Sequence, residues 1–213
     1  MNIPYEVRQL IAIIESYNPF LVGGCVRDSL IGIEPKDFDI VVDKLDHILL
    51  NMLKDGGWRN TEVVTQNGKT RIWNLVKYFP IYDTIPGTKI SYISDEKPYL
   101  IELIEYEGGS INSDSERRDL TINSLYYDIK NDNIVDPTGK GITDINNKVI
   151  RFNSKRVVYN DHLRIVRAYR LAKQLGFDIE PTSLSLCRNA FHTMMEVVKP
   201  GRLLKEIEKL CLG

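Results

Sequence analysis

The sequence is poor in cysteine, and the three it has, Cys25, Cys187 and Cys211, are too widely spaced for a zinc site or a CxxC redox motif. An odd, scattered set gives no disulfide framework, so we expect free thiols in a reducing, cytoplasmic compartment. No apolar run approaches the roughly 18 residues that cross a membrane, and the first residues, MNIPYEVRQL, lack the pattern of a signal peptide. We therefore expect no membrane partner.

Neither sign of charge is in excess. The 213 residues include 28 Lys and Arg against 29 Asp and Glu, a net charge of −1. Any binding of nucleic acid must therefore come from local clusters of basic residues. The hydrophobic content of 43% suits one or two small domains with a real core and excludes a disordered tail.

The rest of the chain is organised around residues 20–43, which read FLVGGCVRDSLIGIEPKDFDIVVD. The apolar run Phe20–Val22 predicts a strand that turns sharply at Gly23-Gly24, since glycine removes the Cβ that would obstruct a close approach. A helix from about Val26 would carry Arg27 in its first turn. Free backbone N–H groups and a guanidinium around one point attract phosphate.

The same segment continues into a β-rich run with two acids, Asp37 and Asp39. Residues at i and i+2 of a strand share one face, roughly 6.5–7 Å apart. Two like charges at that spacing favour a neutralising cation, and hard oxygen ligands with few protein contacts suit Mg²⁺. DxD alone is more often a surface feature with two solvated aspartates, but the preceding GG-x-x-R-D motif favours a metal site.

Together these motifs resemble a known family. GGCVRD followed by DFD resembles the first motif of the class II CCA-adding enzymes and bacterial poly(A) polymerases, within the DNA polymerase β-like nucleotidyltransferase superfamily. ERRDLTINSLYYDI, at residues 116–129, resembles the family motif RRDFTINA. Residues 134–151 resemble its DPFGG segment, and NDHLRIVRAYRL, from residue 160, resembles EDxxRxxRaxRF, with Asn160 in place of glutamate.

The resemblance implies an α+β fold. It predicts a nucleotidyltransferase head at residues 1–135, with a small mixed sheet and flanking helices, and an all-helical neck at 136–213 for nucleotide selection and RNA contact. It covers nearly all of residues 18–210 but only the head and neck of the family. We therefore expect weak, salt-dependent tRNA binding, or a homo-oligomer or accessory partner in place of the body and tail.

Hydrophobic spacing and turn residues predict the elements between the motifs. Helices are expected at 4–17, 43–53, 160–175, 181–197 and 203–212, strands at 37–42, 70–78 and 99–106, a hairpin turn at 66–69, an irregular excursion at 80–98 and a polar loop at 108–115.

A third carboxylate usually joins such a site from a neighbouring strand. Glu102 and Glu105, in the run YLIELIEY, are both candidates. They face opposite sides of a strand, so at most one can join Asp37 and Asp39. We favour Glu102, and the alternative that both glutamates are solvated stays open.

Arg118 and Asp119 would provide a donor fork for a triphosphate and an acceptor for a ribose hydroxyl. Asn123, one helical turn later, would meet the same ligand. With the resemblance, the predicted nucleotide-binding residues are Gly23, Gly24, Arg27, Asp28, Arg118, Asp119, Asn123, Asp161, Arg164, Arg167 and Arg170. Asp37 and Asp39 are the predicted metal ligands, and Glu102 is the third catalytic carboxylate.

Asp161 and Arg164 form an acceptor beside a donor fork on one helix face. Cytosine and adenine both present a ring acceptor beside an amino donor, whereas guanine and uracil present the reverse. The pair therefore suits CTP and ATP. The alternative is a surface salt bridge between residues i and i+3.

The sequence predicts a Mg²⁺-dependent nucleotidyltransferase that adds C, A or both to an RNA 3′ end, most simply CCA to tRNA. The alternatives are a poly(A)-, CC- or A-adding polymerase on another RNA, and a catalytically idle nucleotide- or RNA-binding module.

Asp161→Ala removes the acceptor for the amino group of the base. We expect discrimination of CTP and ATP from GTP and UTP to fall by roughly 1–3 kcal/mol, while triphosphate binding through Arg27 and Arg118 survives. Single-nucleotide incorporation with each of the four NTPs measures this. An unchanged order of preference in the variant would identify the pair as a salt bridge.

Overall fold

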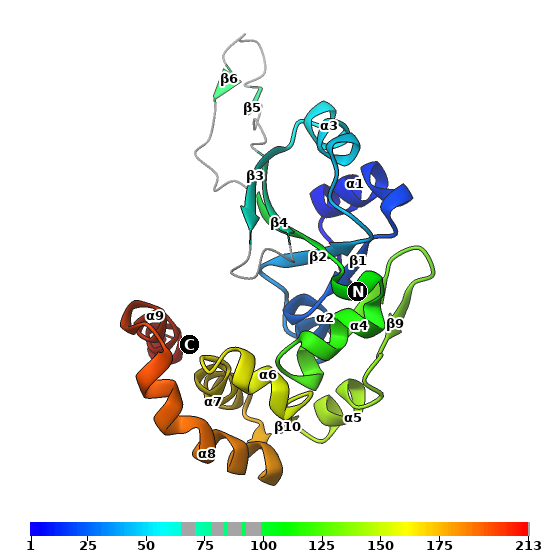
Figure 1. Cartoon of the computed structure of the whole chain (residues 1–213). Helices are drawn as coiled ribbons and strands as arrows, with labels where there is room; N and C mark the ends of the chain where they lie inside the picture. The colour runs from blue at the N-terminus through cyan, green and yellow to red at the C-terminus, as the bar shows by residue number, and fades with distance from the viewer. Residues whose placement is uncertain (65–70, 78–82, 85–90, 93–98, 213) are drawn as a thin grey trace. The chain divides into compact units, whose positions relative to one another are not determined.

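The computed structural model describes residues 1–64, 71–77, 83–84, 91–92 and 99–212 (Figure 1). The chain forms two compact units. Unit 1 comprises Met1, Phe20–Lys36 and Tyr106–Gly213, and unit 2 comprises Asn2–Pro19 and Asp37–Glu105. The expected division into head and neck cuts the chain elsewhere, between residues 135 and 136, and stays a prediction.

Unit 2 combines helices with a four-stranded sheet. In chain order its elements are α1 (Tyr5–Ile13), η1 (Glu15–Tyr17), β2 (Phe38–Val42), α3 (His47–Asp55), β3 (Arg59–Val64), β4 (Arg71–Lys77), β5 (Asp83–Thr84), β6 (Ser91–Tyr92) and β7 (Tyr99–Glu105). The strands lie in the order β3-β4-β7-β2. β2 and β7 are parallel, and the other two pairs are antiparallel. β5 and β6 form a separate antiparallel pair.

The core of unit 2 follows the periodicity of its sequence. Val7, Leu10 and Ile14, spaced at helical intervals, are all fully buried. α1 ends earlier than expected because the chain passes through η1 and then Asn18, which has the left-handed φ of 46°. α3 begins later than expected, at His47, because Asp46 accepts hydrogen bonds from the first free N–H groups of that helix.

Unit 1 contains the remaining elements. They are β1 (Phe20–Val22), α2 (Gly24–Leu30), η2 (Glu107–Gly109), α4 (Ile111–Arg117), η3 (Thr121–Asn123), β8 (Tyr126–Asp128), β9 (Asn133–Val135), α5 (Gly141–Asn146), β10 (Val149–Ile150), α6 (Lys155–Asn160), α7 (Arg164–Leu175), β11 (Asp178–Ile179), α8 (Pro181–Val197) and α9 (Pro200–Leu212). β1, β8 and β9 pair antiparallel in that order. In Figure 1, α6 to α9 form the helical C-terminal part, from yellow to red.

The predicted α+β class and mixed sheet are confirmed, with differences in detail. The predicted strands at 20–22, 37–42, 70–78 and 99–106 are observed within one residue at each end, and α8 has the predicted bounds. A short parallel pair, β10 with β11, interrupts the part that was expected to be all helical. The expected hairpin turn at 66–69 lies outside the described residues, as does most of the expected excursion at 80–98.

Two further predictions about helices were wrong. The expected polar loop at 108–115 contains α4, which begins after Ser110, whose hydroxyl caps the N–H of Ser113. The expected helix at 160–175 is divided, because α6 ends at Asn160 and α7 begins only at Arg164. Asp161 between them has an extended backbone, with φ −148° and ψ 100°.

A buried ion-pair cluster holds α4 against β8. The Asp114 carboxylate is fully buried, and its Oδ2 accepts from Arg118 Nε at 2.9 Å and from the Tyr126 hydroxyl at 2.7 Å. Its Oδ1 lies 2.6 Å from Arg117 Nη2. Burial raises the pKa of Asp114, but the charges of Arg118 and Arg117 outweigh that effect and hold the pKa below its ordinary value.

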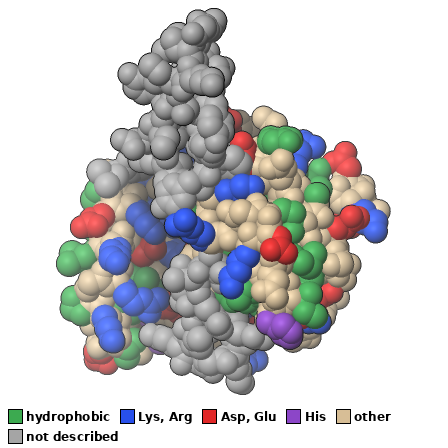
Figure 2. Space-filling view, turned by 90° about the horizontal axis from the view of Figure 1, so that it is seen from above, with side chains coloured by type: hydrophobic (Ala, Val, Ile, Leu, Met, Phe, Trp, Pro, Cys, Tyr) green, Lys and Arg blue, Asp and Glu red, His purple; other side chains and the backbone are tan. Residues whose placement is uncertain are grey.

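None of the described helices is long and apolar enough to span a membrane. On the face of the molecule in Figure 2, basic and acidic side chains are interspersed with hydrophobic ones, in keeping with the net charge of −1.

Gly141→Ala tests the packing of α5. A Cβ on Gly141 would lie 2.7 Å from both the Thr121 carbonyl oxygen and Leu125 Cδ2, so α5 has to shift. We expect a loss of about 1–3 kcal/mol in the free energy of unfolding, measured by urea denaturation. Gly201→Ala is the control, because a Cβ there meets no atom within 4 Å. Equal effects of the two changes would contradict the packing described.

Asp114→Asn tests the buried cluster by its pH dependence. A carboxylate with a lowered pKa in the folded state stabilises the fold above its unfolded pKa of about 3.9, and this stabilisation is lost as the pH falls through the folded pKa. We expect the wild type to lose more unfolding free energy than the variant between neutral pH and about pH 3. Denaturation series at both pH values measure this, and parallel losses in the two proteins would refute it.

Candidate nucleotide and metal site

The predicted metal ligands lie at the start of β2 in unit 2. Phe38 and Ile40 are buried, so the alternating positions Asp37 and Asp39 share the other face of the strand. Asp37 is exposed and Asp39 half-buried. Val41, further along that face, is fully buried, so the face is open only toward the beginning of the strand.

The sheet register distinguishes the two candidate glutamates. Asp39 pairs with Glu102 across the parallel strands β2 and β7, so their side chains leave the same face. Glu102 is exposed there. Glu105 instead accepts a hydrogen bond from the Leu45 backbone N–H, with its Oε2 at 2.8 Å. The geometry thus brings Glu102, and not Glu105, beside Asp39.

Within the described ranges, no three acidic, histidine or cysteine side chains come close enough to hold a metal by themselves. Asp37 and Asp39 do offer carboxylate oxygens on one open strand face. That donor set fits Mg²⁺, which takes few protein ligands and completes its shell with water and substrate phosphates.

Most of the predicted nucleotide-binding arginines lie in unit 1, and a polar network connects them. Gly23, with φ 79°, makes the sharp turn that the sequence predicted and begins α2. Arg27 on α2 donates from Nη1 to Asn123 Oδ1 at 2.6 Å and pairs with Asp28 through Nη2, also at 2.6 Å. The Asn123 amide in turn donates to Asp119 Oδ1 at 3.1 Å.

Asp119 extends this network to α7. Its Oδ2 lies 3.2 Å from Arg167 Nε, an ion pair without good hydrogen-bond geometry. Burial raises the pKa of Asp119, but Arg167, Asn123 and Arg164 together lower it below its ordinary value. Asp119 and Asn123, expected to meet a nucleotide, are therefore bonded within the protein and link three segments of the chain.

Arg118 lies in the buried cluster with Asp114. Its guanidinium carbon is 5.5 Å from the centre of the Tyr126 ring, and its Nε is bonded to Asp114 and to the Tyr126 hydroxyl. Sequence reasoning missed Asp114 and Tyr126. The spacing of Asp114 from Arg117 and Arg118, at i+3 and i+4, was the available signal.

The predicted base-reading pair is arranged differently from expectation. Asp161 and Arg164 do not share one helix face, since α7 begins after Asp161. Asp161 Oδ2 accepts from Arg202 Nη2 at 2.9 Å, and Arg164 Nη1 donates to the Arg117 carbonyl oxygen at 2.8 Å. Burial lowers the pKa of Arg164. The alternative of a simple surface salt bridge between Asp161 and Arg164 is thus not what the structure contains.

Arg170 is held within the helical part. Its Nε bonds to Glu206 Oε2 at 2.9 Å, and both side chains are largely buried. Of the predicted arginines, this one is the most fully occupied by a protein carboxylate.

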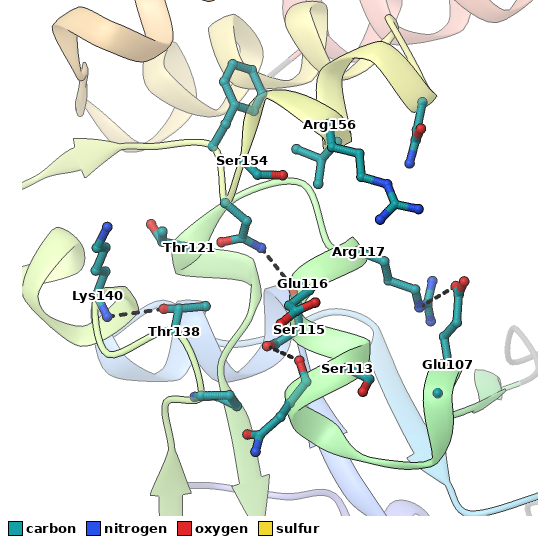
Figure 3. A pocket seen from close by; sticks show the side chains of 17 residues that line it. Glu107, Ser113, Ser115, Glu116, Arg117, Thr121, Thr138, Lys140, Ser154 and Arg156 are labelled. Carbon is teal, nitrogen blue, oxygen red and sulfur yellow. Dashed lines mark hydrogen bonds and ion pairs between the residues drawn. The ribbon is translucent and has the colours of Figure 1, made fainter.

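The largest cavity described in unit 1, about 790 Å³, lies beside these residues but contains none of them (Figure 3). It is lined mainly by polar side chains of α4, η3 and the segments around Thr138 and Ser154. Figure 3 shows Arg117 at its wall, facing Glu107, whose Oε2 lies 3.2 Å from the guanidinium.

Comparison with known proteins agrees with these motifs. The family described as the poly(A) polymerase head domain matches residues 19–151. Poly(A) polymerase I of Escherichia coli O157:H7 is 33% identical over 204 residues, which are 91% of this chain and 42% of that protein. The CCA-adding enzyme of Ligilactobacillus salivarius is 30% identical over 223 residues, covering 100% of this chain and 51% of that protein.

The fold has matches among solved structures as well. A tRNA nucleotidyltransferase, solved in complex with a primer tRNA and an incoming ATP analog, superposes with a TM-score of 0.69 at 26% identity, over 94% of this chain and 54% of that chain. The chain thus spans about half the length of the relatives it matches. The resemblance predicted from its motifs is confirmed, and the chain belongs to the poly(A) polymerase head-domain family of nucleotidyltransferases.

Proposed function

We propose that the protein is a template-independent RNA nucleotidyltransferase that adds C, A or both to an RNA 3′ end and releases pyrophosphate. CCA addition or repair on tRNA is the version we favour. The family supports the reaction class, and the similarity to a nucleotidyltransferase solved with a primer tRNA and an ATP analog supports the substrates.

The observation that carries the proposal is the placing of Asp39 beside Glu102 on one open strand face, with Asp37 two residues before. An idle nucleotide-binding module would keep the arginines of unit 1 but has no use for three acids on one face. Like charges so close repel one another, and a bound cation removes that cost. We therefore favour an active enzyme over the idle module.

Asp37 and Asp39 would hold Mg²⁺, with Glu102 as the third acid of the site. When bound, the ion lowers the pKa of the primer 3′-hydroxyl and stabilises the charge of the leaving pyrophosphate. The exposed carboxylates keep part of the coordination shell open for substrate oxygens.

The arginines of unit 1 would bind the triphosphate of CTP or ATP. Arg27 and Arg118 each have one side fixed by a protein carboxylate, which orients the guanidinium for a second anion. Asp161 and Arg164 would read the base. Both have protein partners in the structure, so reading a base requires Asp161 to exchange Arg202, or to share it, with the amino group of the base.

The second candidate is a poly(A)-, CC- or A-adding polymerase on another RNA, favoured by the identity to poly(A) polymerase I. A cytoplasmic location agrees with the three free cysteines, Cys25, Cys187 and Cys211. The expected oligomer or accessory partner stays a prediction.

Incubation with labelled tRNAs that end before, within and after CCA, with each NTP singly, tests the function. We expect C and A to be added to the shortened tRNAs and G and U to be rejected. Addition of A alone, to any RNA 3′ end, would favour the second candidate. Binding of NTPs without any addition would identify the idle module.

Asp37→Ala and Asp39→Ala should each reduce nucleotide addition by at least a hundredfold, because each removes a ligand of the proposed metal, while the melting temperature stays close to that of the wild type. The assay is incorporation of CMP into a tRNA that lacks CCA, followed alongside thermal unfolding. More than a tenth of the wild-type rate in either variant would sink the metal assignment.

Glu102→Gln and Glu105→Gln form a matched pair in the same assay. Glu102→Gln should lower kcat, whereas Glu105→Gln should lower only stability, because Glu105 serves the Leu45 backbone. The reverse result would exchange the roles of the two glutamates.

A further inference from the structure

The Arg118 guanidinium is bonded on one side and lacks a partner at one end. Its Nε donates to Asp114 Oδ2 at 2.9 Å, and the Tyr126 hydroxyl oxygen lies 3.1 Å from the same nitrogen. Its Nη2 is buried, yet no group in the described part of the chain accepts a hydrogen bond from it. A buried donor without a partner is costly, and a native structure rarely keeps one without a reason.

The Asp114 carboxylate is shared between two neighbouring arginines. Oδ1 binds Arg117, and Oδ2 binds Arg118. Arg117 has a second carboxylate, Glu107, within 3.2 Å, whereas Asp114 is the only carboxylate paired with Arg118 among the described residues. Asp114 therefore fixes the position of Arg118 without a competing anion at the Nη2 end.

Tyr126 restricts the remaining freedom of the guanidinium. Its hydroxyl donates to Asp114 Oδ2 at 2.7 Å, and its ring lies beside the Arg118 guanidinium carbon, 5.5 Å from the ring centre. The hydroxyl holds the carboxylate, and the ring limits rotation of the guanidinium plane.

We infer that Asp114, assisted by Tyr126, is a positioning residue for nucleotide binding, which holds Arg118 by its Nε so that Nη2 is presented to a phosphate oxygen of the incoming triphosphate. This inference rests on the proposed function, in which Arg118 binds the triphosphate. A phosphate oxygen accepts a charge-assisted hydrogen bond and would satisfy the buried donor. Since every NTP has the same triphosphate, the contribution of Asp114 is independent of the base.

Two variants test the inference by kinetics. Asp114→Asn keeps the shape of the side chain and removes its charge, and Tyr126→Phe removes only the hydroxyl. KM and kcat for CTP and ATP, and the equilibrium Kd of each nucleotide, are measured for the two variants, for the wild type and for Arg118→Ala.

Unit 2 provides a matched control. There the Tyr17 hydroxyl donates to Asp46 Oδ1 at 2.9 Å, and Lys44 Nζ lies 2.9 Å from Asp46 Oδ2. Asp46→Asn and Tyr17→Phe make the same chemical changes in the same kind of cluster, away from any predicted site residue.

We expect Asp114→Asn to raise the Kd and KM for CTP and ATP alike by about tenfold, the effect of weakening one hydrogen bond to a charged group, and Tyr126→Phe to raise them by about threefold. The ratio of CTP to ATP use should not change. In an Arg118→Ala background, Asp114→Asn should have no further effect on Kd, because the two residues act as one. The unit 2 controls should change only the melting temperature.

An unchanged Kd in folded Asp114→Asn, or additive effects in the double variant, would overturn the inference and leave the proposed function standing. If Asp114→Asn does not fold, Tyr126→Phe decides, and a wild-type Kd in that variant counts against the inference. A wild type that binds neither CTP nor ATP would overturn the proposed function, and the inference with it.

Discussion

A single buried carboxylate, that of Asp119, determines how the motifs of unit 1 come together. Its Oδ1 accepts from the Leu120 N–H and from the Asn123 amide, and its Oδ2 faces Arg167. A charge in that position is tolerated only if it is paired, since removing one partner of a buried ion pair leaves an uncompensated charge. The pairing requirement therefore joins Arg27, Asn123 and Arg167, which belong to three separate segments of the sequence, around one point.

The same requirement explains why the arginines of unit 1 are ordered before any ligand binds. Arg118 is held by Asp114, Arg170 by Glu206 and Arg27 by Asp28. Each carboxylate removes part of the charge of its arginine but also removes most of the side-chain freedom. The helical C-terminal part contributes in the same way, because Arg202 of α9 holds Asp161.

Those parts of the fold and the site that depend on local sequence could be predicted. The alternation around Asp37 and Asp39 locates β2, and two adjacent glycines locate the turn into α2, because both signals act within a few residues. The choice of Glu102 over Glu105 follows the same logic in part. Strand periodicity separates the faces of the two glutamates, but only the register with β2 brings Glu102 beside Asp39.

The features that were mispredicted or missed depend on pairings that a single sequence does not reveal. α4 has little apolar periodicity, so its polar residues indicated a loop, although the Ser110 cap and the pairs from Asp114 to Arg117 and Arg118 stabilise a helix. The partner of Asp161 is Arg202, 41 residues away, so the shorter spacing to Arg164 gave the wrong geometry. Long-range ion pairs of this kind leave no periodic signal.

The balance between charge and order decides whether paired arginines can still bind a triphosphate. An arginine free in water has roughly 2 kcal/mol of rotamer entropy to lose when it binds. A protein carboxylate on the Nε side has already imposed most of that loss during folding, at the cost of weakening the attraction for a second anion. Two charges about 4 Å apart still attract by roughly 4 kcal/mol at an effective dielectric constant of about 20. Because a triphosphate carries several negative charges and each protein carboxylate only one, the attraction that remains exceeds what the pairing removes. Pre-ordered donors such as Arg118 Nη2 can then bind without a further ordering cost.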